Sequence, residues 1–378
     1  MTVFPDVAAF RRDLEQLGGQ LEYDVTAAEN WGRFPAVAWK ACADLGVLGL
    51  PAAVRHGGSQ ADPRWIAVVL EEVGAHCRDN GLLFAVGAQL WSCVVPLTLF
   101  GTAQQQAQYL PGLCAGDILA AQAMTEASSG SDALALTTEA TADGAGFLLD
   151  GVKSYVTNAP DADLFTIYAR TDPELGFAGI SAFLVAAESP GLEVGPPVAK
   201  SGMRTAPMAE VRLRGCAVGP EDLLGPRGAG MAIFHRAMEW ERSFILAPAV
   251  GTMRRQLAAG VEHARTVRRA GRALGQHQAV SHRLVDMRIR LETSRLFLYE
   301  TARHKSAGRN DAVRAAMTKL HLSESFLAFA YDASALYGAT GYLTGSETER
   351  TLRDALAARI YSGTSDIQRN VIAGGLGL

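Results

Sequence analysis

The spacing of apolar residues changes twice along the chain and divides it into three blocks. From residue 1 to about 120, stretches such as 36–50 and 65–76 repeat apolar residues at the period of a helix. Between about 121 and 225 the period shortens to two, which is typical of strands. From about 230 the helical period returns and continues to the end. The pattern predicts a helical domain over 1–120, a β domain over 121–225 and a helical bundle domain over 226–378.

Two Asp-Gly pairs divide the first part of the β block into short apolar runs. Asp143-Gly144 and Asp150-Gly151 lie on either side of residues 147–149. Asp-Gly is a favoured sequence for the two-residue turn of a β-hairpin. We therefore expect two consecutive hairpins here, followed by strands over residues 165–169 and 180–185.

One uncharged segment in the first helical block is long enough to cross a bilayer. It covers residues 81–100 and carries no Asp, Glu, Lys or Arg. Gln89, Ser92 and Pro96 interrupt it, and no asymmetry of charge flanks it. We expect a buried helix pair in a large core instead of a membrane span.

The helix predicted over residues 230–254 has a carboxylate on its apolar stripe. Glu241 follows Met238 by three residues and precedes Phe244 by three, so the three side chains share one face. Burial would raise the pKa of this carboxyl group toward neutrality, as suits a general base. Glu239 falls on another side of the helix, and we expect it to face solvent.

A second interpretation of Glu241 remains open from the pattern alone. A buried carboxylate is costly unless it is paired or used in catalysis. Arg242 and Arg236 are close enough in sequence to form a buried ion pair with it. The spacing of residues does not decide between an ion pair and a catalytic base.

Composition and charge exclude several classes of function. The chain has 378 residues, a hydrophobic fraction of 48% and a formal net charge of −4, with no dense basic run that would bind nucleic acid. Four arginines within 265–272 fit a helix end or a subunit contact. Five cysteines without C-x-x-C spacing favour reduced thiols, and no signal peptide pattern opens the chain. We expect a cytoplasmic protein without a metal site.

Three short motifs resemble those of the acyl-CoA dehydrogenase family. Residues 122–132 read Q-A-M-T-E-A-S-S-G-S-D, residues 153–158 read K-S-Y-V-T-N and residues 360–368 read I-Y-S-G-T-S-D-I-Q. The family patterns are close to T-E-P-x-x-G-S-D, K-x-[WFY]-I-T-N and Y-E-G-T-S-E-I-Q-R. Their order and separations match over nearly the whole chain. The resemblance implies the acyl-CoA dehydrogenase fold, which is mainly α, with a small β-barrel domain between two helical domains.

The third motif lacks the residue that is the catalytic base in most of this family. The usual glutamate after the tyrosine is Ser362 here. A minority of members place the base on the helix before an arginine, which Glu241-Arg242 matches. W-E-R at 240–242 and N-A-P-x-A-D at 158–163 also resemble L-prolyl-[peptidyl carrier protein] dehydrogenases, the flavoenzymes of pyrrole-forming natural-product pathways.

This resemblance implies FAD-dependent α,β-dehydrogenation of an aminoacyl thioester on a phosphopantetheinylated carrier protein. The expected reaction converts L-prolyl-carrier protein to the pyrrolyl-2-carboxyl form, or to a pyrroline, by a homotetramer or at least a homodimer. Glu241 would be the base, and the backbone N–H of Ser362 would bind the thioester oxygen. An acyl-CoA or acyl-carrier-protein dehydrogenase on another acyl group, a flavin-dependent monooxygenase and a non-catalytic relative remain as alternatives.

The resemblance also implies which residues contact FAD and substrate. The positions that match FAD contacts are Met124, Thr125, Gly130, Ser131, Tyr155, Thr157, Arg268, Gln278, Gly338, Thr364 and Asp366. The positions that match substrate contacts are Ser131, Trp240, Arg242 and Gly363.

The chain departs from the family where the adenosine end of FAD would bind. The family's R-K-[QT]-F-G reads V-R-R-A-G at 267–271, so Val267 and Ala270 replace an arginine and a phenylalanine. Ala335 replaces the usual Gln or Arg of a second pattern. Either Arg268 or Arg269 substitutes for the missing arginine, or FAD is bound more weakly than in other members. We expect Gln278 and Gly338 to reach FAD from the neighbouring subunit.

Overall fold

The computed structural model describes residues 7–21, 23–31 and 34–378. The first helical block contains α1 (Val7–Leu21), α2 (Val25–Trp31), α3 (Ala36–Asp44), α4 (Pro63–His76), α5 (Asn80–Gln89), α6 (Val95–Phe100) and α7 (Ala103–Ala115). Side-chain caps define the N-termini of several helices in this block. Asp62 caps α4 by accepting from the Arg64 N–H, and Thr102 with Gln105 forms a capping box at α7.

The uncharged segment forms one continuous helix with a local irregularity. Asn80–Phe100 comprises α5, the π-helical turn η3 (Leu90–Val94) and α6. It is long and apolar enough to cross a membrane by composition alone, but 78% of its apolar window is buried inside the protein. The segment is therefore buried as expected, although it is a single helix and not a helix pair.

The middle block forms an eight-stranded sheet. Its strands are β1 (Ala120–Ala123), β2 (Glu139–Asp143), β3 (Gly146–Thr157), β4 (Leu164–Arg170), β5 (Ile180–Ala186), β6 (Leu192–Val194), β7 (Met208–Val218) and β8 (Leu223–Leu224). The order is β6-β7-β3-β2-β4-β5-β8, with β1 parallel to β4 off this path. β4 and β5 pair along their whole length, which confirms the two strands expected at 165–169 and 180–185.

Only one of the two expected hairpins forms. β2 and β3 pair from Glu139↔Asp150 to Asp143↔Gly146, and Gly144 adopts the positive φ of +58° that the turn requires. The prediction of a second turn at Asp150-Gly151 is wrong. β3 continues through this pair, and its register against β7 shifts here, because β7 has one more residue than β3 between the pairs Leu149↔Cys216 and Gly151↔Leu213.

The last block is a bundle of long helices. These are α8 (Gly230–Phe244), α9 (Ala247–Thr266), α10 (Gln278–Ser306), α11 (Ala312–Tyr337), α12 (Glu347–Ala358) and α13 (Ser365–Gly375), with a small hairpin of β9 (Arg268–Arg269) and β10 (Arg272–Ala273) before α10. The single helix predicted over 230–254 is wrong. Pro248 lacks the N–H that would bond to the Phe244 carbonyl, so α8 ends and α9 begins anew with proline in its first turn.

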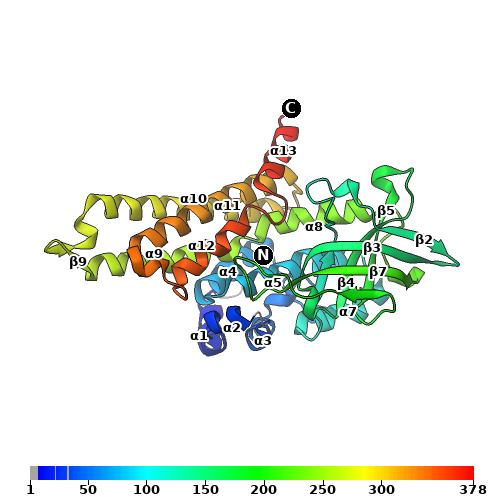
Figure 1. The fold of residues 1–378 in the computed structure, drawn as a ribbon, viewed down its shortest axis with the longest axis horizontal. Helices are drawn as coiled ribbons and strands as arrows, with labels where there is room; N and C mark the ends of the chain where they lie inside the picture. Colours follow the sequence, from blue (N-terminus) through cyan, green and yellow to red (C-terminus); the bar gives the residue numbers. More distant parts are fainter. Residues whose placement is uncertain (1–6, 22, 32–33) are drawn as a thin grey trace.

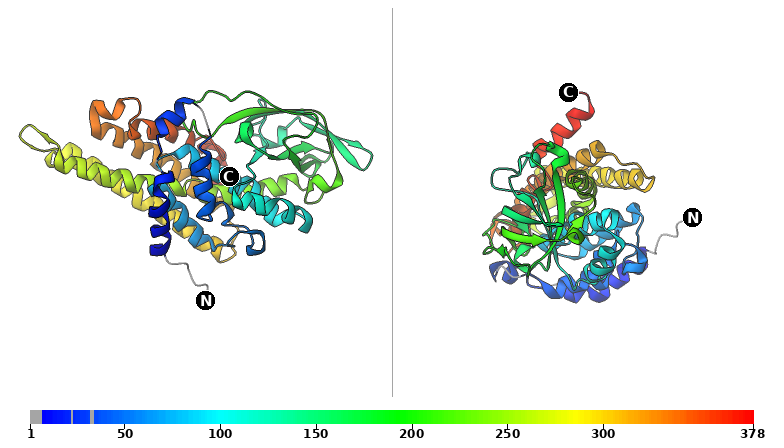
Figure 2. Two further views of the ribbon diagram at one scale, coloured as in Figure 1. Left: turned by 90° about the horizontal axis from the view of Figure 1, so that it is seen from below. Right: turned by 90° about the vertical axis from the view of Figure 1, so that its right-hand side faces the viewer.

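The three blocks lie along one elongated molecule (Figure 1). The sheet occupies one end, and the α9–α10 connection with β9 forms the opposite end. The view from below shows the same separation, with the helices of the first block beside the bundle (Figure 2). α4 packs against α9 and α10, and α8 packs against α11 and the π-turn η3. α8, which carries Glu241, therefore lies where the last helical block contacts the first.

Candidate active site

A buried ion pair joins the first two motifs. The Lys153 Nζ donates to the Glu126 Oε1 at 2.8 Å and to the Met124 carbonyl at 3.2 Å, and the Lys153 side chain is fully buried. The Glu126 carboxylate also accepts from the backbone N–H and the hydroxyl of both Thr137 and Thr138. These donors hold the pKa of Glu126 down at about 2 despite burial. The glutamate and lysine of the motifs thus hold together the two backbone segments that carry Met124 and Thr157.

The second motif is connected to the third through α5. Asn158 has a φ of +68°, and its Nδ2 donates to the carbonyls of Ala85 and Ala120 at 3.3 Å. One residue before Ala85, the Phe84 ring lies 4.4 Å from the Tyr361 ring, centroid to centroid. The three motifs, far apart in sequence, therefore converge on the α5–η3 helix.

Glu241 lies at this convergence and is buried, with 7% of its surface exposed. Its Oε1 accepts a hydrogen bond from the Ser362 hydroxyl at 2.5 Å, and its Oε2 accepts one from the Ser92 hydroxyl at 2.6 Å. Burial raises the pKa of Glu241 above its ordinary value, while the two serine hydroxyls, Arg242 and Lys319 oppose that shift. A buried carboxyl group with a raised pKa can take a proton near neutral pH.

The ion-pair interpretation of Glu241 fails, and the expectation for Glu239 is wrong. Across residues 7–21, 23–31 and 34–378, no Lys or Arg forms a salt bridge with Glu241. Glu239 is buried with 8% exposure, because it pairs with Arg236 at 2.9 Å and with Lys305 at 2.8 Å. Lys305 comes from α10, 66 residues away, so the pattern along α8 could not reveal this pair.

The loop at Ser362 and Gly363 is fixed by side chains from three helices. Both residues have positive φ, +57° and +83°. The Ser362 carbonyl accepts from Arg242 Nε at 3.3 Å and from Gln368 Nε2 at 3.1 Å. The Gly363 carbonyl accepts from Lys319 Nζ and Gln368 Nε2, both at 2.8 Å. Both carbonyls therefore have side-chain donors, which fix the conformation of this loop.

The backbone N–H of Ser362 has no acceptor in the part of the chain that the structure describes. An unpaired N–H next to a carboxylate is suited to bind a developing negative oxygen while the carboxylate removes a proton. Lys319 is fully buried, and desolvation lowers its pKa to about 7, so it supplies a buried, titratable cation beside this loop.

Sequence reasoning missed Ser92, which contacts Glu241 directly. It lies in the π-turn η3, and it is 4% exposed. The only signal was a hydroxyl within an otherwise apolar run. The adjacent Trp91 is fully buried and stacks on Trp240, with 6.1 Å between ring centroids. Lys305 Nζ lies 4.4 Å above the Trp240 ring. Trp240, which was predicted to contact substrate, therefore packs against both Trp91 and a cation.

The donors expected near the flavin are available. Thr125 and Thr157 are half-buried and Ser131 is exposed, and none of their hydroxyls has a hydrogen-bond partner within the described residues. Ser154 N–H donates to the Thr125 carbonyl at 2.8 Å, which places the first motif beside β3. Tyr155 is 62% exposed and has a φ of +58°. Free hydroxyls beside an exposed aromatic ring fit the phosphates and ring system of FAD.

Other predicted positions are not brought to this site by the chain itself. Arg268 lies in the β9–β10 hairpin, and Gln278 begins α10, both at the end of the molecule opposite the sheet (Figure 1). Gly338 follows α11, where Tyr337 contacts His263 of α9 near the same end. Arg268 Nη2 donates to the Gly271 carbonyl at 2.8 Å.

Two further predicted positions have evident structural roles. The Thr364 hydroxyl accepts from the Ile367 N–H at 3.2 Å and caps α13. The Asp366 side chain is 87% exposed and pairs with Arg369. Gly130 lies in the exposed loop before Ser131, and Met124 is buried with Cys93, Val94 and Met231.

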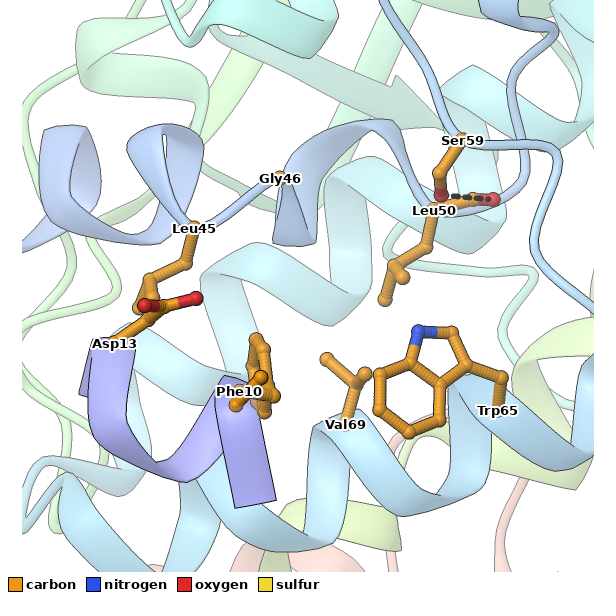
Figure 3. A pocket seen from close by; sticks show the side chains of 9 residues that line it. Phe10, Asp13, Leu45, Gly46, Leu50, Ser59, Trp65 and Val69 are labelled. Atoms are coloured by element: carbon orange, nitrogen blue, oxygen red, sulfur yellow. Dashed lines mark hydrogen bonds between the residues drawn. The ribbon is translucent and has the colours of Figure 1, made fainter. Parts of the chain in front are cut away.

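Two cavities lie away from this convergence. One, of about 220 Å³, is lined by Phe10, Leu45, Leu50, Trp65 and Val69, with the Asp13 carboxylate and Ser59 at its edge (Figure 3). The other, of about 590 Å³, lies between Phe34 and the loops at Pro160 and Pro197. Neither includes Glu241, Ser362 or a residue of the three motifs that contacts them.

Family models match nearly the whole chain. The acyl-CoA dehydrogenase N-terminal domain matches residues 15–117, the middle domain residues 121–216 and the C-terminal domain residues 228–377. Together with the similar solved structures, these matches confirm the fold that the three motifs implied.

Several relatives cover about nine tenths of the chain. An L-prolyl-[peptidyl-carrier protein] dehydrogenase of Pseudomonas fluorescens is 39% identical over 90% of both chains. The protein of the same name from Serratia is 38% identical over 90% of this chain and 88% of its own. Human short-chain specific acyl-CoA dehydrogenase is 34% identical over 91% of this chain and 83% of its own.

Two solved structures superpose closely. The prolyl acyl carrier protein oxidase AnaB is 44% identical, covers 98% of this chain and 99% of its own, and gives a TM-score of 0.96. PigA, solved with FAD and proline, is 34% identical over the full length of both chains with a TM-score of 0.95.

Proposed function

This chain belongs to the acyl-CoA dehydrogenase family, and we propose that within it the protein oxidises L-prolyl thioester on a phosphopantetheinylated carrier protein, with FAD as cofactor. Bound FAD supplies the acceptor for the hydride that leaves Cβ. One oxidation gives a pyrroline, and a second with tautomerisation gives the pyrrolyl-2-carboxyl thioester. Similarity to AnaB, PigA and the L-prolyl-carrier protein dehydrogenases supports the substrate class and the carrier-protein partner.

The observation that carries the proposal is the contact between Glu241 and Ser362. The Ser362 hydroxyl is 2.5 Å from Glu241 Oε1, so a base on α8 lies beside the C-terminal motif position that holds the base in most of the family. We assign to Glu241 the removal of the Cα proton. Its burial raises its pKa, which strengthens it as a base relative to an exposed carboxylate.

The residues around Glu241 would bind and orient the thioester. The unpaired N–H of Ser362 would donate to the thioester oxygen as negative charge develops on it. Arg242, Gln368 and Lys319 hold the carbonyls of Ser362 and Gly363, so the loop does not need to rearrange when substrate binds. Trp240, stacked on Trp91, would form an apolar wall that excludes water from the acyl group.

Thr125, Ser131 and Thr157 would hold FAD through their free hydroxyls, with Arg268, Gln278 and Gly338 of a second subunit at its far end. We infer a homotetramer, or at least a homodimer, in the cytoplasm, and domains at 1–120, 121–225 and 226–378. Large apolar side chains are exposed on the last block, where a second copy would cover them. They include Val285, Ile289, Leu296, Tyr331, Tyr342, Leu343, Leu356 and Ile360.

Glu241→Gln tests the assignment. The amide keeps the shape of the carboxylate but cannot accept the proton, so we expect a yellow protein whose turnover of L-prolyl-carrier protein falls roughly 100-fold or more. Turnover is measured by mass spectrometry of the carrier-bound acyl group. Free L-proline should not react with the wild-type protein, because a carboxylate does not acidify Cα as a thioester does.

Each failure would point to a different error. Normal turnover by the Gln variant would show that another group is the base. A wild-type protein that ignores prolyl-carrier protein but oxidises an acyl-CoA would leave the family intact and overturn the substrate. A protein that remains colourless when mixed with excess FAD would overturn the assignment of a catalytic flavoenzyme.

A further inference from the structure

The π-turn η3 determines which side chain of the α5–η3–α6 helix faces Glu241. A π-turn accommodates one extra residue, and one residue in a helix corresponds to a rotation of about 100°. All side chains after the turn are therefore rotated relative to those before it. Ser92 lies inside the turn, in Leu90–Val94, and its hydroxyl donates to Glu241 Oε2 at 2.6 Å. π-turns often occur at functional sites, and this one brings a polar side chain to a buried carboxylate.

We propose that Ser92 is a positioning residue for Glu241, an inference that rests on the proposed role of Glu241 as the base. Ser362 holds Oε1 from the C-terminal motif, and Ser92 holds Oε2 from the first helical block. Two donors at the two oxygens fix the orientation of the carboxylate, and with it the direction of the lone pairs that would accept the proton. Both bonds also favour the ionised form, which is the form that can accept a proton.

The contacts of Ser92 distinguish this role from simple satisfaction of a buried hydroxyl. A serine inside a helix commonly bonds to a carbonyl three or four residues earlier. Within residues 7–21, 23–31 and 34–378, the Ser92 hydroxyl donates only to Glu241. Ser323 of α11, by contrast, is fully buried and donates to the Leu320 carbonyl of its own helix. The two serines are thus matched in burial but differ in partner.

Other ionisable groups around Glu241 set the background for this effect. Arg242 of α8 and Lys319 of α11 favour its ionised form through their charge. Among the residues that the structure describes, the other ionisable side chains that interact with Glu241 are Cys93, Tyr168 and Tyr361. Each is neutral at physiological pH, because burial raises its pKa. Loss of Ser92 removes one of two direct donors and leaves these charges in place.

The test compares Ser92→Ala with Ser92→Thr and with Ser323→Ala. A hydrogen bond to a charged group contributes roughly 1.5–3 kcal/mol, which corresponds to about a 10- to 100-fold effect. For Ser92→Ala we expect flavin content unchanged, kcat at pH 7 lowered about 10-fold or more, and KM little changed. The acid limb of the pH–kcat profile should move to higher pH by about one unit. Ser92→Thr keeps the hydroxyl and should keep both kcat and the acid limb at their wild-type values. Ser323→Ala should change neither quantity.

Several results would overturn the proposal. An acid limb that does not move in Ser92→Ala would show that the hydroxyl does not act on the base, whatever happens to kcat. An equal loss in Ser323→Ala would indicate a general packing effect. If Ser92→Ala does not fold, Ser92→Cys, with a weaker donor of similar shape, should show the same shift in smaller measure, and its absence would be equally decisive.

A double variant separates this inference from the proposed function. In Glu241→Gln, the further change Ser92→Ala should cost nothing more, because the group that Ser92 positions is already inactive. An additional loss would overturn the positioning role while leaving the assignment of Glu241 intact. Failure of Glu241→Gln to affect turnover would instead overturn the proposed function.

Discussion

At the scale of single residues, the site brings the side chains of two distant sequence positions into contact. Glu241 and Ser362 are 121 residues apart, and their side chains meet at 2.5 Å. The sequence predicted the apolar-face position of Glu241 correctly, because helical periodicity alone decides it. The expectation that Ser362 matters only through its backbone N–H omitted its hydroxyl, because a contact between distant segments is not visible in either segment.

Because these two side chains are in contact, we predict that the carboxylate of Glu241 and the hydroxyl of Ser362 can exchange positions. Glu241→Ser should lose nearly all turnover, and Ser362→Glu alone should also be impaired, because two neighbouring carboxylates raise the pKa of one of them. The double variant Glu241→Ser with Ser362→Glu should recover at least 10-fold over Glu241→Ser, roughly in line with the contribution of a general base. The measurement is kcat on the carrier-bound substrate.

A double variant no better than Glu241→Ser would show that a carboxylate at 362 cannot reach Cα. The third comparison, Ser362→Ala, controls for loss of the hydroxyl and should retain the flavin.

At the scale of secondary structure, buried polar contacts connect elements that the sequence presents separately. The ion pair of Lys153 on β3 with Glu126 after β1 is fully enclosed, with 0% and 4% of the two side chains exposed. Both residues belong to motifs that the sequence revealed, but only the structure shows that they form a salt bridge with each other. The break between α8 and α9 could have been predicted from Pro248, whereas the continuation of β3 through Gly151 could not, because Asp-Gly is also a good turn sequence.

Removal of one partner of this ion pair should destabilise the protein strongly. Lys153→Met leaves the Glu126 carboxylate buried without its cation, and we expect a loss of about 3–5 kcal/mol in the free energy of unfolding. Because Glu126 anchors the loop next to Thr125, flavin should also be retained less well. Denaturant titration and flavin absorbance after gel filtration measure the two effects.

Lys40→Met is the matched control, since Lys40 is 52% exposed and its contacts, with Asp44, Asp117 and the Ala115 carbonyl, lie at the surface. A similar loss in both variants would contradict the special role of the buried pair. The double variant Lys153→Met with Glu126→Gln should be less destabilised than Lys153→Met, because it leaves no unpaired charge.

At the scale of the whole molecule, the three blocks meet around Asp354 of α12. Its Oδ1 accepts from the Met203 N–H at 2.5 Å, and its Oδ2 accepts from Asn80 Nδ2 at 3.0 Å. Met203 belongs to the segment after the β domain's β6, and Asn80 begins α5. Periodicity predicted the three blocks because each has its own pattern. It could not predict how they join, because this joint consists of polar residues from three separate patterns.

The joint makes stability depend on pH. Burial raises the pKa of Asp354 from 3.8 to about 7, so the folded state binds the proton more tightly than the unfolded state. The stabilising effect of this proton is complete below about pH 4 and is lost as pH rises to about 7. Three pKa units correspond to roughly 4 kcal/mol. Asp354→Asn should therefore show a smaller fall in unfolding free energy between pH 5 and pH 8 than the wild type.

Urea titrations at the two pH values measure this difference. Asp366→Asn, at a side chain that is 87% exposed, should behave like the wild type. An equal fall in Asp354→Asn and the wild type would mean that other groups cause the pH dependence.

The π-turn has a consequence for the comparison of relatives by alignment. A relative with a regular α-helix in place of Leu90–Val94 would be one residue shorter there and would align with a gap of one position. Its serine, even if present in the same column as Ser92, would point in another direction. When relatives are compared, the length of the segment at Leu90–Val94 is therefore a better guide than the identity of its residues to whether a hydroxyl can reach the carboxylate on the neighbouring helix.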